Sequence, residues 1–306
     1  MSSAGVRSVA RFDYHLHPDF SIDASGTVRE FCEAALARGL VDICFTTHCD
    51  TNSAHAAEDA WVSVGGKVRP LSEPWLPDYL AEIEAARRTF AARGLRVRAG
   101  LEVDFFPGAA RALDALLAGV PLDFVLGSVH RVEGYALSDR AGVRAWLERF
   151  GPRDALVRYY DLVGEAAGSS LFDCIGHLDI YRRSAGLAGE EQLALPGVMD
   201  AVTRALAALV QSGTGLEINT RGTYRAGAAH VSPGPVLLRL AAAAGVPLLT
   251  LGSDAHQPRD VGLGLDLGIA AACAAGFRVQ HTFEGRRPQA QPLSAETAGD
   301  AVARSR

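Results

Sequence analysis

Apolar strands and amphipathic helices alternate through most of this chain, and this alternation limits the folds open to it. After a first short strand that ends in "DYHLH", further strands are expected at residues 41–46, 95–103, 122–129, 171–177, 214–219, 246–252 and 277–283. Helices are expected at 27–38, 78–94, 139–149, 153–168, 196–212 and 232–244. Repeated strand–helix units indicate a parallel sheet, and this many of them favour a closed α/β barrel over an open sheet.

Local signals mark the ends of two of these helices. Thr27 and Glu30 form a capping box at the start of the helix over 27–38, and Gly39 follows where a helix C-cap favours glycine. In the helix over 232–244, Ser232 is the expected N-cap and Pro233 the first helical residue.

No break in composition divides the 306 residues, of which 48% are hydrophobic. We therefore expect one barrel domain over residues 1–284. Within it, the polar stretch 49–77 contains three prolines and is predicted to be an irregular excursion or lid. Residues 285–306 are mostly small and polar, and we expect them to form a loosely ordered tail.

Charge and cysteine usage argue against several classes of protein. The formal net charge of −5 and the pI of about 6.0 give no indication of a nucleic-acid-binding surface. The first residues lack the apolar region of a signal peptide, and no apolar run is long enough to span a membrane. The five cysteines show no C-x-x-C spacing, which is typical of buried thiols in a reducing cytoplasm. A cytoplasmic protein without nucleic-acid or membrane partners is expected, and its oligomeric state is not predicted.

Six of the nine histidines stand at the carboxyl ends of expected strands. A single H-x-H pair is equally typical of a solvated strand end, but here the placement recurs from strand to strand. The carboxyl face of an α/β barrel is where such enzymes carry their chemistry. The polar side chains at these strand ends are His15, His17, His48, Glu102, His130, His177, Asp254 and His256. The other three histidines, His55, His230 and His281, do not fit the pattern and are interpreted as ordinary core or surface residues.

Imidazoles with a few carboxylates form a ligand set that suits Zn²⁺, Fe²⁺ or Mn²⁺ better than Ca²⁺ or Mg²⁺. With Asp23 the candidates number nine, which is too many for one tetrahedral ion, so two or three divalent ions are expected. Glu102 is the candidate bridge, because one carboxylate has two oxygens. Such a cluster stabilises an in-line displacement at phosphorus.

The motifs "DYHLH", "TTHCD", "GLEVD", "GSVH", "GHLD" and "GSDAH" resemble, in order and spacing, those of the PHP (polymerase and histidinol phosphatase) superfamily over about residues 10–260. Through "GLEVDFFPG", "LGSVHRVEG" and "GHLDIYRR" the chain is most similar to the monofunctional histidinol-phosphate phosphatases. The resemblance implies a distorted (β/α)7 TIM-like barrel with a trinuclear metal site. Carried over by position, it implies three ligand sets: His15, His17, Glu102 and Asp254; Glu102, His130 and His177; and Asp23, His48 and His256.

The chain departs from the family pattern at two positions. Many members have histidine where this chain has Asp23, which implies a third ion that is weaker or different. Many also have aspartate where this chain has Thr47, a change beside a ligand rather than at one.

Phosphate binding requires cations as well as metals. Arg182, Arg183 and Arg221 follow strand ends and are the candidate substrate-binding residues, because the arginine fork matches phosphate oxygens. Arg131 and Arg225 are weaker candidates. Glu217 and Asn219 lie at a strand end and could contact a substrate amine. The expected catalytic residues are Glu102, Asp254 and His256, and no acid for the leaving group is assigned.

The expected activity is metal-dependent hydrolysis of a small phosphomonoester, L-histidinol phosphate, to L-histidinol and phosphate in histidine biosynthesis. One alternative is a PHP-type phosphoesterase that acts on nucleotides or oligonucleotide ends. Another is a metal-dependent amidohydrolase, although the only lysine, Lys67, does not end a central strand and so cannot serve as a carbamylated bridge. A third alternative is a PHP barrel without activity that is kept as an interaction module. Such a module would be expected to have lost metal ligands, whereas all nine positions here hold a residue able to bind metal.

Overall fold

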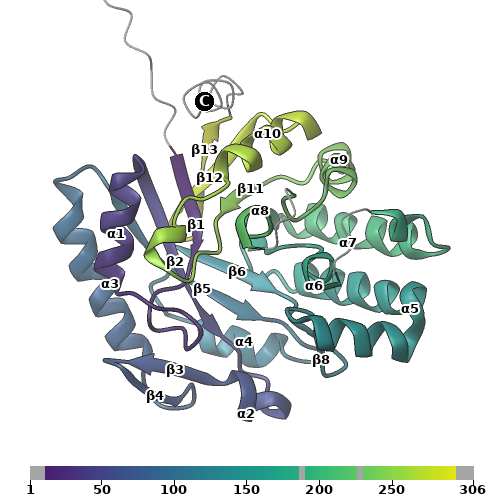
Figure 1. Ribbon diagram of the computed structural model, residues 1–306, viewed down its shortest axis with the longest axis horizontal. Helices are drawn as coiled ribbons and strands as arrows, with labels where there is room; N and C mark the ends of the chain where they lie inside the picture. Colours follow the sequence, from purple (N-terminus) through teal and green to yellow (C-terminus); the bar gives the residue numbers. More distant parts are fainter. Residues whose placement is uncertain (1–10, 186–189, 226–229, 294–306) are drawn as a thin grey trace, which may run out of the picture.

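A computed structural model describes residues 11–185, 190–225 and 230–293. Seven strands in this part of the chain form one parallel sheet, in the order in which they occur in the sequence (Figure 1). They are β1 (Arg11–Leu16), β2 (Leu40–Cys49), β5 (Arg96–Asp104), β6 (Phe124–Ser128), β9 (Cys174–Ile175), β10 (Gly215–Asn219) and β11 (Leu249–Gly252). The sheet curls into a nearly closed barrel, which confirms the α/β barrel expected from the sequence.

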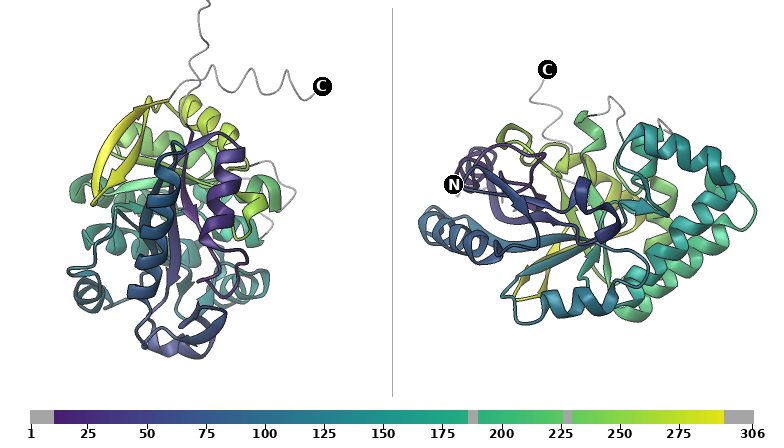
Figure 2. Two further views of the ribbon diagram at one scale, coloured as in Figure 1. Left: turned by 90° about the vertical axis from the view of Figure 1, so that its left-hand side faces the viewer. Right: turned by 90° about the horizontal axis from the view of Figure 1, so that it is seen from below.

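The longer helices lie around the outside of the strands (Figure 2). They are α1 (Val28–Ala37), α3 (Leu76–Ala91), α4 (Ala110–Leu117), α5 (Arg140–Gly168), α7 (Val198–Ser212), α9 (Pro235–Ala244) and α10 (Leu265–Ala275). Short helical turns are α2 (Ala56–Asp59), α6 (Tyr181–Ala185), α8 (Gly222–Arg225), η1 (Ser53–His55), η2 (Glu191–Ala194) and η3 (Pro258–Asp260). None of the helices in the described ranges combines the length and apolar character needed to cross a membrane.

The helix signals were partly right. The capping box of Thr27 and Glu30 is present at the start of α1. The two helices expected at 139–149 and 153–168 are both present within α5, where they meet at a kink at Gly151, whose backbone is not helical and whose φ is 73°. The N-cap of α9 is Gly234 rather than the expected Ser232, and Pro235 rather than Pro233 stands in its first turn. Ser232 is used elsewhere, because its backbone pairs with Asn219 of β10.

One seam of the barrel is weakly paired. β1 is not laddered to β11; in the described residues an isolated bridge joins Leu16 to Ala255, just beyond β11, with a hydrogen bond of 2.9 Å from the His17 N–H to the Ala255 carbonyl. The buried carboxylate of Asp13 supplements it: one oxygen accepts from the Ser253 N–H at 2.8 Å, and the other accepts from the Ser253 hydroxyl at 2.5 Å and the Gly262 N–H at 2.8 Å. Hydrogen bonds to the Asp13 side chain therefore replace part of the backbone pairing between these strands.

The segment 49–77, which was expected to be an irregular excursion or a lid, contains regular secondary structure. It holds η1, α2 and an antiparallel hairpin of β3 (Trp61–Val64) and β4 (Lys67–Pro70). The hairpin lies at the opposite end of the molecule from β12 and β13 (Figure 1). A second small hairpin, β7 (Arg131–Val132) with β8 (Tyr135–Ala136), follows β6.

The expected loose tail from residue 285 was also wrong in its first part. β12 (Val279–Glu284) pairs with β13 (Arg287–Pro292) in an antiparallel hairpin outside the seven-stranded sheet. The hairpin turn is tied to residues just before β6 and β9: the Gly285 N–H donates to Asp123, and Arg286 pairs with Asp173 at 3.1 Å. The hairpin therefore covers the amino-terminal end of the barrel. The remainder of the expected tail, 294–306, lies outside the described residues.

Candidate metal centre

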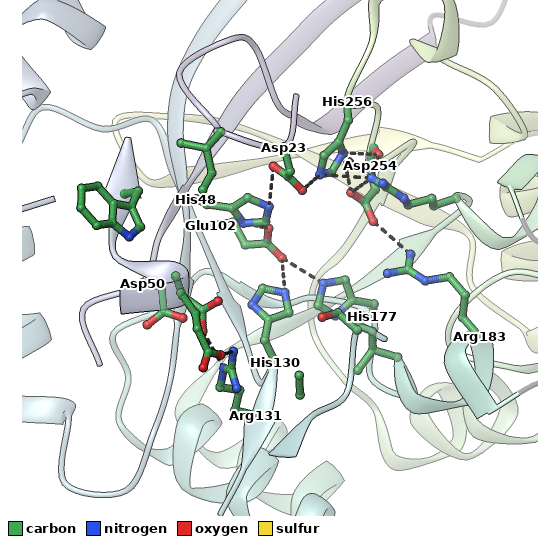
Figure 3. Close-up of a pocket in the computed structure, with 18 residues that line it drawn as sticks. Asp23, His48, Asp50, Glu102, His130, Arg131, His177, Arg183, Asp254 and His256 are labelled. Atoms are coloured by element: carbon green, nitrogen blue, oxygen red, sulfur yellow. Dashed lines mark hydrogen bonds and ion pairs between the residues drawn. The ribbon is translucent and has the colours of Figure 1, made fainter. Parts of the chain in front are cut away.

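The carboxyl ends of the strands bring all nine predicted metal ligands to one place. Seven of them line the cavity drawn in Figure 3, all except His15 and His17. His15, His48 and Glu102 stand on β1, β2 and β5, and His130, His177 and Asp254 stand two residues after β6, β9 and β11. Because parallel strands end at the same face of the barrel, residues far apart in the sequence meet there.

Glu102 is the centre of this cluster, and its side chain is only 1% exposed. Its Oε2 lies 3.3 Å from His15 Nε2, 3.4 Å from His17 Nε2 and 3.0 Å from His48 Nδ1. Its Oε1 lies 3.2 Å from His130 Nε2 and 2.9 Å from His177 Nε2. Five imidazoles therefore surround one buried carboxylate.

The remaining three candidates complete the ring around this centre. Asp254 Oδ1 lies 3.8 Å from His15 Nε2 and 3.6 Å from His17 Nε2. Asp23 Oδ2 lies 3.0 Å from His256 Nε2, and its Oδ1 lies 3.8 Å from His48 Nε2. The side chain of Asp23 is 53% exposed, so it lies at the rim rather than in the centre.

The residues fit divalent metal ions. The buried Nε2 atoms of His15 and His17 make no hydrogen bond to any described residue, although imidazole nitrogens normally find a partner when buried. Three groups have ligand atoms that all lie within 4.8 Å of one another: His15, His17 and Glu102; Glu102, His130 and His177; and His17, His48 and His256. Imidazole with carboxylate oxygen is a donor set typical of Zn²⁺ and related ions.

The electrostatics of the cluster favour cations. Burial opposes ionisation of Glu102, yet His15, His130 and His48 hold the pKa of its carboxyl well below the usual range. Burial lowers the pKa of His17 well below its usual value, and the neighbouring His48 and His256 lower it further, so this imidazole is neutral as a metal ligand requires.

Several residues around the cluster orient its imidazoles. Glu217, which is buried, lies 2.5 Å from His15 Nδ1 and accepts from the His177 N–H at 2.9 Å. Asp104 lies 3.3 Å from His130 Nδ1, and Ser21 Oγ lies 3.3 Å from His17 Nδ1. Such partners fix which ring nitrogen faces a metal. The sequence suggested that Glu217 could contact a substrate amine. In the structure it lies behind His15 and does not line the cavity, so it is not placed for that contact.

The backbone is strained at two of the strand ends. His177 has a φ of 24° and Asp254 a φ of 54°, a region that residues other than glycine rarely adopt.

The glycine of "LGSDAH" is needed for close approach: a Cβ at Gly252 would lie 2.3 Å from His15 Cβ and 2.5 Å from Glu217 Oε1.

A cavity of about 400 Å³ opens over the cluster. Arg183 and Arg221 line it, and both pair with Asp254, at 3.3 and 2.9 Å. Arg221 also contacts His256. The prediction for Arg182 was wrong: it lies outside this cavity, is 3% exposed and pairs with Asp179 at 2.7 Å. Neighbouring positions on a helix point in different directions, which the sequence could not resolve for this arginine pair.

The weaker candidates also have places in the structure. Arg131 lines the cavity and pairs with Glu58 at 2.5 Å and Asp59 at 2.6 Å, both in α2. Arg225 pairs with Asp260 at 2.9 Å instead. Lys67 lies exposed on β4, so no lysine stands at the cluster.

Comparisons with known proteins agree with this geometry. The model of the PHP domain family matches residues 13–221. The chain belongs to the PHP family. A Deinococcus radiodurans protein named "Probable histidinol-phosphatase" is 39% identical over 278 residues, covering 90% of this chain and 98% of that protein. A Lactococcus lactis histidinol-phosphatase is 26% identical, covering 90% of this chain and 96% of its own length.

A solved structure shares the fold. The crystal structure of histidinol phosphate phosphatase from Lactococcus lactis, complexed with zinc, L-histidinol and phosphate, superposes with a TM-score of 0.72 at 23% identity. The match covers 92% of this PHP chain and 100% of that one. The expected distorted seven-stranded PHP barrel is thereby confirmed.

Proposed function

We propose that this PHP protein is a metal-dependent phosphomonoesterase that hydrolyses L-histidinol phosphate to L-histidinol and phosphate, a reaction of histidine biosynthesis. The observation that carries the proposal is the cluster of five imidazoles around the buried Glu102, with two arginines beside it in one cavity. The names of the relatives, which match over nearly their whole lengths, narrow the substrate within the phosphomonoesters.

The proposed ligand sets follow the clustering of donor atoms. We assign the first ion to His15, His17, Glu102 and Asp254, and the second to Glu102, His130 and His177. The third is assigned to Asp23, His48 and His256. Zinc, iron or manganese, bound as two or three ions, would supply Lewis-acid chemistry at phosphorus. We propose Glu102, Asp254 and His256 as catalytic residues, because each would hold a metal ion and lines the cavity.

Arg183 and Arg221 are the proposed phosphate-binding residues. Both guanidinium groups already lie against Asp254, so their forks are held at the metal end of the cavity. During the reaction a water oxygen gives up a proton and forms a bond to phosphorus, and the ester P–O bond breaks. The alcohol oxygen leaves with the bonding electron pair and takes up a proton. The arginines hold the phosphoryl oxygens in place while this charge moves.

We also propose a cytoplasmic location. All five cysteines are free, and four of them are buried, as is typical of proteins from a reducing compartment.

A phosphate-release screen with purified, metal-analysed protein tests the proposed reaction. Histidinol phosphate, 4-nitrophenyl phosphate, nucleoside monophosphates and 5′-phosphorylated oligonucleotides serve as substrates. We expect two or three equivalents of zinc, iron or manganese per chain, loss of activity in chelator, and the highest kcat/KM for histidinol phosphate. Better cleavage of a nucleotide or an oligonucleotide end would refute the proposed substrate, and full activity in chelator would refute the metal dependence.

A further inference from the structure

One carboxylate in the cavity differs from all the others. Six carboxylates line it: Asp23, Asp50, Glu58, Asp59, Glu102 and Asp254. Five of them pair with a histidine or an arginine. Asp50 has no such cationic partner among the described residues; its side chain accepts only the Asn52 N–H, at 3.0 Å.

Asp50 is also nearly enclosed, with 8% of its surface exposed. An ionised carboxylate that is removed from water without a cation costs free energy, so proteins seldom keep one unless a ligand supplies the missing charge. The hydrogen bond from Asn52 holds the side chain at the base of the 49–77 segment, and its position is therefore fixed before any ligand arrives.

The cavity is electrically asymmetric. Asp50 and Arg131 lie on one side of it, and Arg183 and Asp254 lie on the other (Figure 3). The guanidinium of Arg131 is already engaged by Glu58 and Asp59, so that side carries excess negative charge. On the opposite side, Arg183 and Arg221 both pair with the single carboxylate of Asp254, so the two guanidinium groups exceed the charge of their partner. A ligand with an anion at one end and a cation at the other would fit this arrangement in one orientation.

We propose that Asp50 binds the cationic end of the substrate, its ammonium or imidazolium group, while the phosphate lies at the arginines. This assignment rests on the proposed function, because it takes the substrate to be a phosphomonoester with a cationic organic part. It makes Asp50 a specificity-determining residue, and it gives the 49–77 segment a role in recognising the alcohol part of the substrate.

The test compares wild type with Asp50→Asn, which keeps the size and the hydrogen bond from Asn52 but removes the charge. Four substrates separate the contributions: histidinol phosphate, phosphoethanolamine with an ammonium only, 2-(imidazol-4-yl)ethyl phosphate with an imidazole only, and 4-nitrophenyl phosphate, whose organic part carries no charge. We expect the ratio of kcat/KM for histidinol phosphate over 4-nitrophenyl phosphate to fall about ten- to a hundredfold, mostly through KM. The kcat/KM ratio over 4-nitrophenyl phosphate is also measured for phosphoethanolamine and for 2-(imidazol-4-yl)ethyl phosphate. If the first ratio falls together with that of histidinol phosphate, Asp50 binds the ammonium; if the second falls, it binds the imidazolium.

Asp114→Asn, an exposed position on α4, is the matched control and should leave every ratio unchanged. An unchanged ratio in Asp50→Asn overturns the inference, and so does an equal fall for all four substrates accompanied by loss of bound metal. The proposed function fails separately, if wild type shows no preference for histidinol phosphate. In that case, a preference for phosphoethanolamine over 4-nitrophenyl phosphate that disappears in Asp50→Asn would still support the role of Asp50.

Discussion

At the amino-terminal end of the barrel, buried carboxylates pair with arginines, whereas at the carboxyl end the buried Glu102 is surrounded by imidazoles, some of whose nitrogens make no hydrogen bond to the described residues. The Asp42 carboxylate forms ion pairs with Arg96, at 2.8 Å, and with Arg98, at 3.3 Å, and the Asp173 carboxylate pairs with Arg286. Around Glu102, by contrast, the Nε2 atoms of two histidines have no hydrogen-bond partner in the described chain. The carboxylates at the amino-terminal end are paired within the protein and support its stability. At the carboxyl end, imidazole nitrogens remain available to bind ligands.

The comparison is tested most strongly by Glu102→Gln, which keeps the size of the side chain but removes charge from two proposed ions. We expect kcat to fall by about a thousandfold or more and the metal content to drop, because five imidazoles lose their common carboxylate. Elemental analysis and phosphate release measure both effects. Asp23→Asn, at the exposed rim, should affect one ion and reduce kcat much less. Equal losses in the two variants would show that the division of ligands is wrong.

Glu217→Gln tests whether the carboxyl end depends on the residues behind its ligands. Glutamine keeps the shape of the side chain but weakens the hold on His15 Nδ1, so the imidazole is less well oriented. We expect the affinity for zinc to fall about ten- to a hundredfold, measured by competition with a chelator. Glu190→Gln is the control, since Glu190 is likewise a carboxylate that accepts from the backbone, in its case two N–H groups at the start of α9. A similar loss in the control would point to general destabilisation.

Arg183→Ala sharpens the comparison at the edge of the cavity. A charge-assisted contact to phosphate contributes about 1.5–3 kcal/mol, so we expect kcat/KM to fall about ten- to a hundredfold while metal content is retained. Arg221→Ala should cost at least as much, because Arg221 also contacts His256. Arg225→Ala, whose guanidinium pairs with Asp260, should leave kcat/KM unchanged. Loss of metal in Arg183→Ala would contradict a role limited to phosphate.

Phe283→Ala probes the amino-terminal end and should have the smallest effect on catalysis. Phe283 of β12 is 1% exposed and packs on Tyr14 and Phe124 at the base of the barrel. Its truncation should lower the free energy of unfolding by about 3–5 kcal/mol. The kcat/KM per folded molecule should stay at the wild-type value, as judged by denaturant melts and assays on the same samples. A large loss of kcat/KM would remove the distinction between the two ends.

The sequence predicted the barrel and its cluster because both depend on periodic signals. A strand recurs, and each time a histidine or carboxylate stands at its carboxyl end, so that His130 and His177 could be placed together without knowing the loops between them. The strand expected at 277–283 corresponds to β12, but its partner β13 was not predicted. Arg287–Pro292 contains two prolines and no β-branched residue, a composition typical of a loop rather than a strand.

Side-chain direction was the other limit. Arg182 and Arg183 are indistinguishable in sequence, but one faces Asp179 and the other faces the cavity. Glu217 was recognised as a strand-end carboxylate, yet its position behind His15 depends on the close approach that Gly252 permits. Asp50 ends the motif "TTHCD", but no role was predicted for it from the sequence. What sets it apart is the lack of a cationic partner in the described structure, a property that only the folded chain has.

The weakly paired seam between β1 and β11 has a consequence for synthesis. The hydrogen bonds from Ser253 to Asp13 join residues 240 positions apart, so they form only after nearly the whole barrel has left the ribosome. His15 and His17 stand on one side of this seam, and Asp254 and His256 on the other. A nascent chain therefore carries an incomplete ligand set until its last barrel strand emerges. A chain released from the ribosome before this last strand has been made would expose the edge of β1 and lack Asp254 and His256, which complete the metal-ligand cluster.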